Sequence, residues 1–343
     1  MARASSIKDV ANRAGVSIGT VSNVLNGKRA VHPELQKRVR EAVAALGYEP
    51  DRAASRLRGR SARVVAVLVP DLTNPFFASL IASIEASVRR DGYDIIVGTS
   101  NSSVAEEGAR LSTLLAWRPD GVVVVPCEDA FPAAALIRRA GVPHVIVDRV
   151  SELFEADAVT VDNVAAGAAS ARHVIDLGHR NVAVAASTLA LRNIRERLAG
   201  IEGVFRARDL RPPNPVEVGL DLEVATERLA TFLGEAGRPS AFIALTNFAT
   251  LGVLSALRRD GLGVPTDVSV VGFDDYVWMR AVSPPLTAIR QPVEEMGRSA
   301  WDRLRSRIEG SRDPFTQVKL DCDLVLRGST AAPASPLGAD RAA

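Results

Sequence analysis

The sequence predicts a small helical head followed by a larger α/β core of two lobes. Residues 7–26 have the apolar period of two short helices joined at a glycine. From Arg63 onward, short runs of branched apolar residues alternate with amphipathic stretches, which is the pattern of parallel strands and crossover helices. Because the roughly 265 residues of this second part exceed the usual size of one such sheet, we expect two doubly wound lobes with a cleft between them.

The first helix of the head is predicted to begin after Ser6 and to end at Gly15. Ser6 followed three residues later by Asp9 is a capping-box pattern. Glycine takes the positive φ of a helix end at little cost, so Gly15 suits the turn that follows. One face of this predicted helix is apolar and consists of Ile7, Val10, Ala11 and Ala14.

The second helix is predicted to start after Ser17, which is a suitable N-cap. Val21, Val24 and Leu25 form its buried side, and small polar residues together with Ile18 form its outer side. Two helices joined by a glycine turn are a common DNA-reading unit, and a helix with a small polar surface fits the major groove. A helical hairpin inside a larger bundle has the same spacing, so spacing alone leaves both interpretations open.

A third helix completes the head, and a basic segment follows it. Pro33 opens this helix at a position that tolerates proline, and Gly47 ends it. Lys28 and Arg29, in the preceding turn, are candidates either for contacts with the DNA backbone or for a solvated loop. Residues 50–60 have four arginines and no face to bury. They are either a flexible linker or a segment that becomes a helix on DNA and places an apolar side chain in the minor groove.

Seven apolar runs are predicted to be strands of the core. They span residues 64–69, 94–98, 121–125, 144–148, 182–186, 241–245 and 268–273. Ligands of doubly wound sheets bind beyond the carboxyl ends of the strands, so the residues that follow these runs are the first candidates for a binding site. The stretches concerned are 70–77, 99–101, 148–149, 187–197, 246–247 and 274–275.

Charge and cysteine content narrow the class of protein. Residues 1–60 carry 12 Lys and Arg against 5 Asp and Glu, while the rest of the chain is mildly acidic. A basic head suits contact with phosphates, because basic side chains release counterions from DNA. Cys127 and Cys322 form neither a metal-ligand pattern nor a disulfide framework, which indicates a reducing cytosol. With no leader pattern and no run of 18 apolar residues, a soluble cytoplasmic protein is expected.

Taken together, these stretches resemble the LacI/GalR family of bacterial transcription regulators over about residues 5–328. DVANRAGVSIGTVSNVLN is similar to the family's head motif, and YEPDRAASRL is similar to its hinge. The core adds VPDLTNPFF, TVDNVAAG, LGHRNVAVAAS, RERLAGI, DVSVVGFDD and PPLTAIRQP in the family's order. The resemblance implies a core like that of periplasmic sugar-binding proteins. It also implies a homodimer that reads a near-palindromic operator and holds a small molecule, a sugar or sugar derivative, in the cleft.

The resemblance also implies roles in DNA binding. The base-reading positions of the second helix correspond to Ile18, Gly19 and Asn23. The positions that hold phosphates or brace the helix correspond to Ser17, Thr20, Ser22 and Asn26. The hinge residues that enter the minor groove correspond to Ala54 and Leu57. Asn23 departs from the family, in which many members have arginine; since asparagine favours adenine and arginine favours guanine, we expect a different base in the operator.

In the core, the resemblance implies a set of effector contacts. They are Asn74, Phe76 and Phe77 on the first lobe, Asp148 near the crossing point, and Arg192, Arg197, Thr246 and Asp274 on the second lobe. Carboxylates and arginine suit the hydroxyls of a sugar or the carboxylate of an acid. Arg197 and Asp274 have the alternative role of a structural ion pair. Thr246-Asn247 replaces the family's usual Asn-Asp, and residues 219–222 lack an aromatic ring, so the effector class stays open.

The predicted domains are a helix-turn-helix head at 1–48, a hinge at 49–61, a core at 62–330 and a disordered tail at 331–343. The first lobe is expected to comprise about 62–161 and 291–320, and the second about 162–290 and 321–330. No phosphate loop, nucleophile elbow or dinucleotide fingerprint is present, and the four histidines have no metal spacing. We therefore predict a protein that is not an enzyme, without catalytic residues, metal or cofactor.

The expected function is that of a repressor whose operator affinity depends on an effector. An exported solute-binding protein is an alternative, but the head and the missing leader pattern argue against it. An architectural DNA-binding protein without an effector is a second alternative, but such a protein would not need a large cleft. The sequence does not fix whether the effector acts as inducer or corepressor; release from the operator is our hypothesis.

Overall fold

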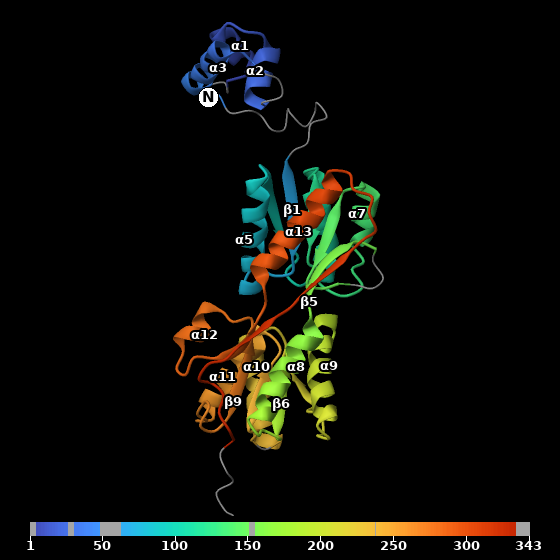
Figure 1. Cartoon of the computed structure of the whole chain (residues 1–343), viewed down its shortest axis with the longest axis vertical. Helices are drawn as coiled ribbons and strands as arrows, with labels where there is room; N and C mark the ends of the chain where they lie inside the picture. Colours follow the sequence, from blue (N-terminus) through green and yellow to red (C-terminus); the bar gives the residue numbers. More distant parts are fainter. Residues whose placement is uncertain (1–4, 27–30, 49–62, 151–154, 237, 334–343) are drawn as a thin grey trace, which may run out of the picture. The chain divides into compact units, whose positions relative to one another are not determined.

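The computed structural model describes residues 5–26, 31–48, 63–150, 155–236 and 238–333 (Figure 1). The chain divides into two compact units, a head at residues 1–62 and a core at residues 63–343. Among the described residues, no helix combines the length and the apolar character that crossing a lipid bilayer requires.

The head consists of the three predicted helices: α1 (Ile7–Ala14), α2 (Ile18–Asn26) and α3 (Pro33–Leu46). The capping box of α1 is confirmed, because Ser6 N donates to Asp9 Oδ2 over 2.8 Å and Asp9 N donates to Ser6 Oγ over 3.3 Å. The glycine positions are confirmed as well: Gly15 has φ 62° and Gly47 has φ 54°. Both helices therefore end where the sequence predicts.

The core of the head fixes the turn between α1 and α2. Val10, Val21 and Val39, one from each helix, are fully buried in a common cluster. Arg38 Nη2 on α3 donates to Ala14 O over 2.6 Å and so ties the end of α1 to α3. The two-helix unit is therefore part of a three-helix head and not of a larger bundle.

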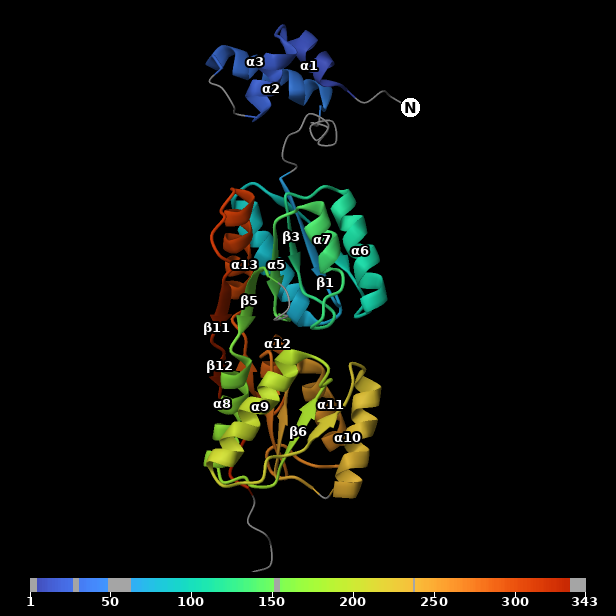
Figure 2. The same ribbon diagram turned by 90° about the vertical axis from the view of Figure 1, so that its right-hand side faces the viewer.

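The first lobe of the core is a six-stranded sheet with two helices on each face (Figure 2). Its strands, in the order in which they pair, are β11 (Gln317–Leu320), β5 (Asp157–Val161), β4 (His144–Val147), β3 (Gly121–Val124), β1 (Val64–Val69) and β2 (Asp94–Thr99). One face is covered by α5 (Pro75–Arg90) and α13 (Val293–Ile308), and the other by α6 (Val104–Ala116) and α7 (Ala134–Ala140). Both faces are buried, which explains the continuous apolar run of β1.

The second lobe repeats this architecture. Its strands, in pairing order, are β12 (Asp323–Val325), β10 (Thr287–Arg290), β9 (Ser269–Phe273), β8 (Ala241–Ala244), β6 (Val182–Ala186) and β7 (Pro215–Glu217). One face is covered by α8 (Asn163–Asp176) and α9 (Arg192–Ala207), and the other by α10 (Leu222–Ala236) and α11 (Asn247–Arg259). The short helix α12 (Val277–Ala281) follows β9.

The chain crosses between the two lobes three times in the described part of the core. The crossings lie between β5 and α8, between β10 and α13, and between β11 and β12. All seven predicted strands are present, and β5, β7, β10, β11 and β12 are additional. β12 pairs antiparallel with β10, which departs from the predicted all-parallel sheets. This departure follows from the chain's return into the second lobe directly after β11.

Helices α8 and α9 approach each other unusually closely. A Cβ atom built on Gly167 of α8 would overlap the carbonyl oxygen of Arg197, and one built on Gly200 of α9 would overlap the carbonyl oxygen of Val164. Two glycines on facing helices therefore let the two backbones touch. This contact places Arg197, on the same helix as Gly200, against the second sheet.

The C-terminal segment of the second lobe is tied to His179. This imidazole is 1% exposed; its Nδ1 lies 2.9 Å from Ser240 Oγ and its Nε2 lies 2.8 Å from Ala331 O. Ala331 N also donates to Ser269 Oγ over 3.0 Å. The first residue of the predicted tail is thus hydrogen-bonded to the core, and residues 334–343 lie outside the described residues.

Acidification is expected to destabilise the core through its buried histidines. Burial lowers the pKa of His179, and it also lowers the pKa values of His144 and His173. The unfolded chain, with histidine pKa values of about 6.5, then binds protons before the folded protein does. The free energy of unfolding should therefore be constant above about pH 7 and fall as the pH drops below about 6.5. Urea unfolding between pH 5 and 8 measures it.

The variant His179→Gln provides the control for this prediction. It keeps a side chain that can hydrogen-bond to Ser240 and Ala331 but removes one titrating group. Its stability should depend less on pH than that of the unmodified chain. The same pH dependence in both proteins would show that His179 does not contribute.

Candidate functional site

The outer side of α2 carries the residues predicted to contact DNA. Ser17 Oγ accepts a hydrogen bond from Thr20 N over 3.1 Å and lies 2.9 Å from Thr20 Oγ1, so it caps α2 as predicted. Ile18 is 48% exposed, Gly19 is exposed, and Ser22 and Asn23 are half-buried. All four are more exposed than Val21, which is fully buried. The other predicted contacts lie outside the described residues: the side chain of Asn26, and Lys28, Arg29, Ala54 and Leu57.

In the first lobe, the three predicted effector contacts at the start of α5 also have roles in the fold. Asn74 is the N-cap of α5, and its Oδ1 accepts from Phe76 N over 3.0 Å. Phe76 and Phe77 are 4% and 3% exposed and belong to the core between the sheet and α13. Their rings pack edge to face with centroids 5.2 Å apart. These two rings therefore belong to the packed core of the lobe, and Asn74 orients the start of the helix.

Asp148 links the two lobes. It follows β4, has φ 65°, and is 5% exposed. Asn193 Nδ2 at the start of α9 donates to its two carboxylate oxygens over 3.3 and 3.2 Å. A cavity of about 220 Å³ opens beside this contact; it is lined by Asp148, Val150, Thr160, Val161, Arg192, Asn193, Glu196, Gln317 and Lys319. Of the predicted contacts, the structure thus brings Asp148 and Arg192 to one cavity.

Asp129 forms a second link between the lobes, which the sequence did not indicate. The N-cap residue of α9, Leu191, provides no side-chain hydrogen bond. Asp129, from the loop after β3, replaces it: its Oδ1 accepts from Arg192 N over 3.1 Å, and its Oδ2 accepts from Arg195 Nη2 over 2.7 Å. A carboxylate at a helix N-terminus is favourable because of the unpaired amides and the helix dipole. One lobe therefore caps a helix of the other.

Asp129→Ala is expected to lower the free energy of unfolding by about 1 kcal/mol, because the cap of α9 and the contact with Arg195 are both lost. Asp129→Asn is the matched control, since it keeps an oxygen that can accept from Arg192 N and loses only the charge. It should cost less than the alanine variant. Urea unfolding of the full chain measures both, and an alanine variant as stable as the unmodified chain would contradict the capping role.

Arg197 is the best-fixed residue of the predicted site. It is 3% exposed; its Nε donates to Asn163 Oδ1 over 2.9 Å and its Nη1 donates to Leu245 O over 2.7 Å. Its guanidinium carbon lies 3.7 Å from the centre of the Phe273 ring. The neighbouring Thr246 is the N-cap of α11, where its Oγ1 accepts from Ala249 N over 3.2 Å. Buried arginine needs such partners, so the guanidinium is held in one orientation.

Asp274 lies close to Arg197 without pairing with it. Gln291 Nε2 donates to Asp274 Oδ1 over 2.6 Å, and no ion pair between Arg197 and Asp274 is present in the described part of the core. Burial raises the pKa of the Asp274 carboxyl group, and the charge of Arg197 opposes this shift. The alternative of a structural ion pair is therefore not what the structure shows. Both side chains keep capacity for a ligand.

Two buried polar atoms near Asp274 have no hydrogen-bond partner in the structure. They are the hydroxyl oxygen of Tyr276 and Oε1 of Gln291. Buried polar groups nearly always have partners, so such atoms indicate where a ligand or water completes the site. Sequence reasoning included neither side chain among the effector contacts, although Tyr276 directly follows the stretch 274–275. Its position three residues beyond the end of the predicted strand 268–273 was the available signal.

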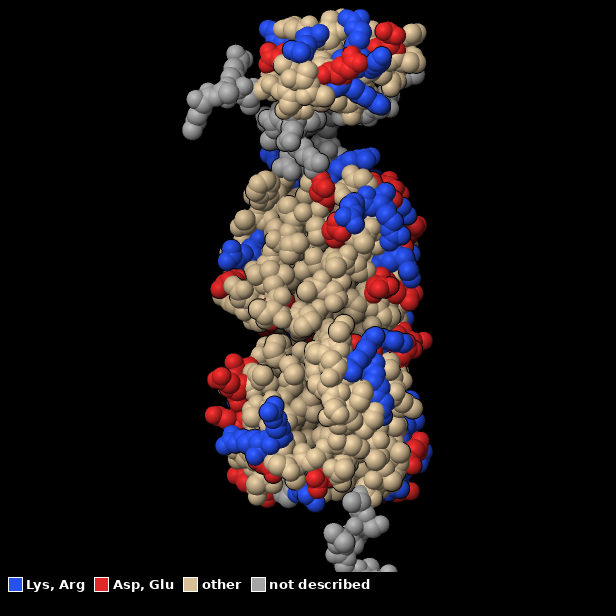
Figure 3. All heavy atoms as spheres, turned by 90° about the vertical axis from the view of Figure 1, so that its left-hand side faces the viewer, with Lys and Arg blue, Asp and Glu red and all other residues tan. Residues whose placement is uncertain are grey.

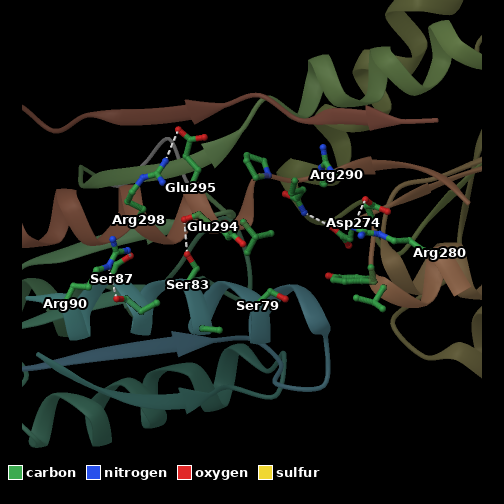
Figure 4. A pocket seen from close by; sticks show the side chains of 18 residues that line it. Ser79, Ser83, Ser87, Arg90, Asp274, Arg280, Arg290, Glu294, Glu295 and Arg298 are labelled. Carbon is green, nitrogen blue, oxygen red and sulfur yellow. Dashed lines mark hydrogen bonds and ion pairs between the residues drawn. The ribbon is translucent and has the colours of Figure 1, made fainter. Parts of the chain in front are cut away.

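A second cavity, of about 1040 Å³, opens between α5, α12 and α13 (Figure 4). Small residues of α5 line one side, among them Ser79, Ala82, Ser83 and Ala86. Figure 3 shows the face of the core on this side, where uncharged side chains cover a broad area across both lobes. Val277 of α12 is 79% exposed. Among the described residues, no group of three or more His, Cys, Asp or Glu side chains is placed to hold a metal ion.

Fold and site define a class of protein: two α/β lobes with polar side chains converging between them, joined to a helix-turn-helix head. Comparison with known proteins agrees with this class. A model of bacterial regulatory proteins of the lacI family matches residues 6–51, and a periplasmic binding protein-like domain matches residues 171–330. The chain belongs to the LacI family and is a transcriptional regulator, not an enzyme.

Several similar proteins match nearly the whole chain. The ribose operon repressor of Haemophilus influenzae is 30% identical over 94% of this chain and 98% of its own length. The transcriptional regulator MalR of Streptomyces coelicolor is 33% identical over 95% and 96%. A crystal structure of the lac repressor dimer bound to operator and the anti-inducer ONPF is 28% identical, with a TM-score of 0.87 over 96% of this chain and 100% of that one. A complex of the regulator CelR with cellobiose is 28% identical, with a TM-score of 0.72 over 95% and 100%.

Proposed function

We propose that this chain is a cytoplasmic repressor whose homodimer binds a near-palindromic operator and whose affinity is set by a sugar or sugar derivative between the lobes. The observation that carries the effector class is the convergence of Asp148, Arg197 and Asp274 from both lobes. Carboxylates accept hydrogen bonds from hydroxyl groups, and a fixed guanidinium donates to them. Relatives named for ribose and cellobiose support the same class.

The mouth of the cleft favours a ligand held by hydrogen bonds more than by ring stacking. Residues 219–222 contain no aromatic residue, and Leu220 is 48% exposed. Residues 219–222 therefore offer no aromatic ring on which a pyranose face could stack. The remaining contacts proposed for the effector are Asn74, Phe76, Phe77, Arg192 and Thr246.

DNA binding is proposed to combine the outer side of α2 with a hinge at residues 49–61. Ile18, Gly19 and Asn23 read bases, and the basic residues of the head contact phosphates. In the hinge, Ala54 and Leu57 enter the minor groove. Leu57→Ala should weaken binding to the specific operator by a few kcal/mol and leave binding to unrelated DNA nearly unchanged. Fluorescence anisotropy on both DNAs tests this; equal losses on both would contradict the hinge role.

The homodimer is proposed to form through the face that carries α5 and α12. This face has a broad uncharged area (Figure 3), and Val277 of α12 is 79% exposed. The cavity beside α5 is lined by small residues on the side of α5 and by charged residues such as Arg280 and Glu295 on the side of α12 and α13. An exposed uncharged face of this kind is typical of a protein interface. A two-fold dimer places two heads for two half-sites of a palindrome.

The switch is proposed to act through the relative arrangement of the two lobes. An effector that binds one arrangement more tightly shifts the population toward it, and operator affinity changes by the corresponding coupling free energy. We propose release from the operator as the direction. The links at Asp129 and Asp148 belong to the arrangement in this structure, so they are the contacts that a different arrangement must break.

The test is operator binding by anisotropy at fixed salt, with the DNA upstream of the protein's own gene and a panel of sugars, sugar acids and nucleosides. Salt is held constant because it alone changes affinity by orders of magnitude. A compound that weakens specific binding supports both the function and the direction. A compound that strengthens it reverses the direction, and specific binding that no compound changes contradicts the proposed effector class.

A further inference from the structure

Two buried side chains of the first lobe bind the backbone where the chain leaves β3. Cys127 N donates to Glu107 Oε1 on α6 over 2.6 Å. From the loop after β4, Arg149 Nη1 donates to Pro126 O over 3.1 Å and to Cys127 O over 3.0 Å. These backbone groups lie beyond the end of β3 at Val124, so the two side chains take over the role of a neighbouring strand.

Both of these side chains are charged groups in the interior of the lobe. Glu107 is 0% exposed and Arg149 is 9% exposed. Burial raises the pKa of the Glu107 carboxyl group, and the hydrogen bond from Cys127 N opposes this shift. Moving a charged group out of water is unfavourable unless hydrogen bonds and opposite charges compensate for it. The backbone of residues 126–127 is a common partner of both groups.

Asp129, which caps α9 of the second lobe, lies two residues beyond this backbone. Its Oδ1 accepts from Arg192 N over 3.1 Å. A hydrogen bond weakens steeply when its donor and acceptor lose their alignment, and the position of a side chain follows the backbone that carries it. If residues 126–127 are free to shift, Asp129 therefore no longer has a fixed position relative to α9.

The guanidinium of Arg149 also supports the second link between the lobes. Arg149 directly follows Asp148, and its Nε lies 3.9 Å from Asp148 Oδ2. Asn193 Nδ2 donates to the same carboxylate over 3.3 and 3.2 Å. Opposite charges attract more strongly in a poorly hydrated interior than in water, so Arg149 also holds the Asp148 carboxylate. Two consecutive residues of α9, Arg192 and Asn193, are thus bound by two loops that share this support.

We propose that Glu107 and Arg149 are positioning residues for the contact between the lobes. They hold the loops after β3 and β4 so that Asp129 and Asp148 bind the start of α9. In the described part of the core, the hydrogen bonds and ion pairs of both side chains lie within the first lobe. A buried pair inside one lobe thus determines how firmly the other lobe is held. Its consequence for DNA binding rests on the proposed function, in which the arrangement of the lobes sets operator affinity.

Hydrogen exchange of the Arg192 amide tests the inference on the full-length chain without a ligand. The first amide of a helix has no partner inside that helix, so the bond to Asp129 protects it. Glu107→Met keeps a side chain of similar length but has no oxygen for Cys127 N. The Arg192 amide should then exchange at least about fivefold faster, as expected for the loss of one hydrogen bond. Mass spectrometry with fragmentation to single residues measures the rate, and an unchanged rate would overturn the inference.

Leu114→Ala is the matched control for a general loss of stability. Leu114 lies on the same helix as Glu107, is 6% exposed, and packs near Gly98 of β2. Its truncation removes packing and leaves the hydrogen bonds of Cys127 in place. The Tm should therefore fall, while the exchange of the Arg192 amide stays unchanged. An equal acceleration in this variant would show that destabilisation of the lobe is the cause, and the inference would be wrong.

Two further variants test the hydrogen bonds themselves. Glu107→Gln keeps an oxygen that can accept from Cys127 N, so the Arg192 amide should exchange more slowly than in Glu107→Met. Arg149→Met removes the donors on the opposite side of residues 126–127 and should also accelerate this exchange. The arginine variant decides the question if Glu107→Met does not fold. An unmodified rate in Arg149→Met would count against the positioning role.

Operator binding separates this inference from the proposed function. A loosened start of α9 favours an arrangement in which the links at Asp129 and Asp148 are broken, as the effector is proposed to do. Glu107→Met should therefore bind the specific operator about fivefold more weakly without effector and bind unrelated DNA equally well. Faster exchange with unchanged operator affinity contradicts the proposed switch and leaves the positioning role standing. Unchanged exchange overturns the positioning role, whatever the operator affinity.

Discussion

Replacing Gly200 by alanine is expected to lower the free energy of unfolding of the core by about 3 kcal/mol or more. A single added methyl group would overlap the backbone of α8 at Val164, and backbone cannot rotate away as a side chain can. Forcing an extra group into a packed interior costs about 1–3 kcal/mol and more when backbone has to shift. Gly167→Ala should have a comparable effect, because its methyl group would overlap the Arg197 carbonyl. Urea unfolding measures both.

Gly203 provides a control on the same helix. A Cβ atom at Gly203 would meet no atom within 4 Å. Since alanine is favoured over glycine inside a helix, Gly203→Ala should raise stability by up to about 1 kcal/mol. The same alanine substitution three residues apart in α9 thus has opposite expected signs. Similar losses in both variants would show that helix backbone contact is not the cause.

Asn23→Ala is expected to remove the preference for adenine at one position of each operator half-site. Asparagine pairs with the two groups that adenine presents in the major groove, and a contact of this kind contributes about 1–3 kcal/mol of discrimination. Selection from random DNA should return adenine with the unmodified chain and all bases at that position with the variant. Affinity for the best operator should fall about tenfold or more.

Asn23→Arg gives the matched comparison, because arginine pairs with guanine in the same groove. The selected base should change to guanine, and the neighbouring positions should stay as they are. Lys8→Ala, a lysine on α1 with its side chain exposed, should weaken binding to all sequences alike if it contacts DNA at all. Selection of guanine by the unmodified chain, unchanged in Asn23→Ala, would contradict the role of Asn23.

Three of the five strands that the sequence did not predict differ from β1 and β3 in how they are buried, whereas β5 and β10 were missed although they are buried. Residues 64–69 and 121–125 are apolar throughout because both sheet faces are covered, so the pattern is visible without a partner. β7, β11 and β12 are edge strands of three or four residues with exposed positions. Their extended form depends on the strand beside them. Local sequence therefore carries too little information to predict them.

The residues of the candidate site likewise fall into those that the sequence predicts and those that only the fold brings together. Arg197 and Asp274 stand in motifs recognisable from the chain alone, whereas Asp129 acts only on a helix that begins 63 residues later. Gln291 meets Asp274 because the chain returns from β10 to the first lobe at that point. Partners brought together by crossings between lobes leave no periodicity in the sequence. A motif can also suggest a role that burial explains equally well. Phe76 and Phe77 match a ligand-binding motif, but both rings are also packed in the core of the first lobe.

The three crossings between the lobes also determine the order in which the protein matures during synthesis. The first lobe begins at β1, but its core includes Met296, Trp301 and Leu304 of α13, and its sheet ends with β11. A ribosome has therefore produced the second lobe as far as β10 before the first can close its sheet. Until then, the face of β3, β4 and β5 that α13 covers is open, and its apolar surface is accessible to other nascent chains. The half made first is thus completed only after most of the other half has been made, so the C-terminal quarter of the chain closes both lobes.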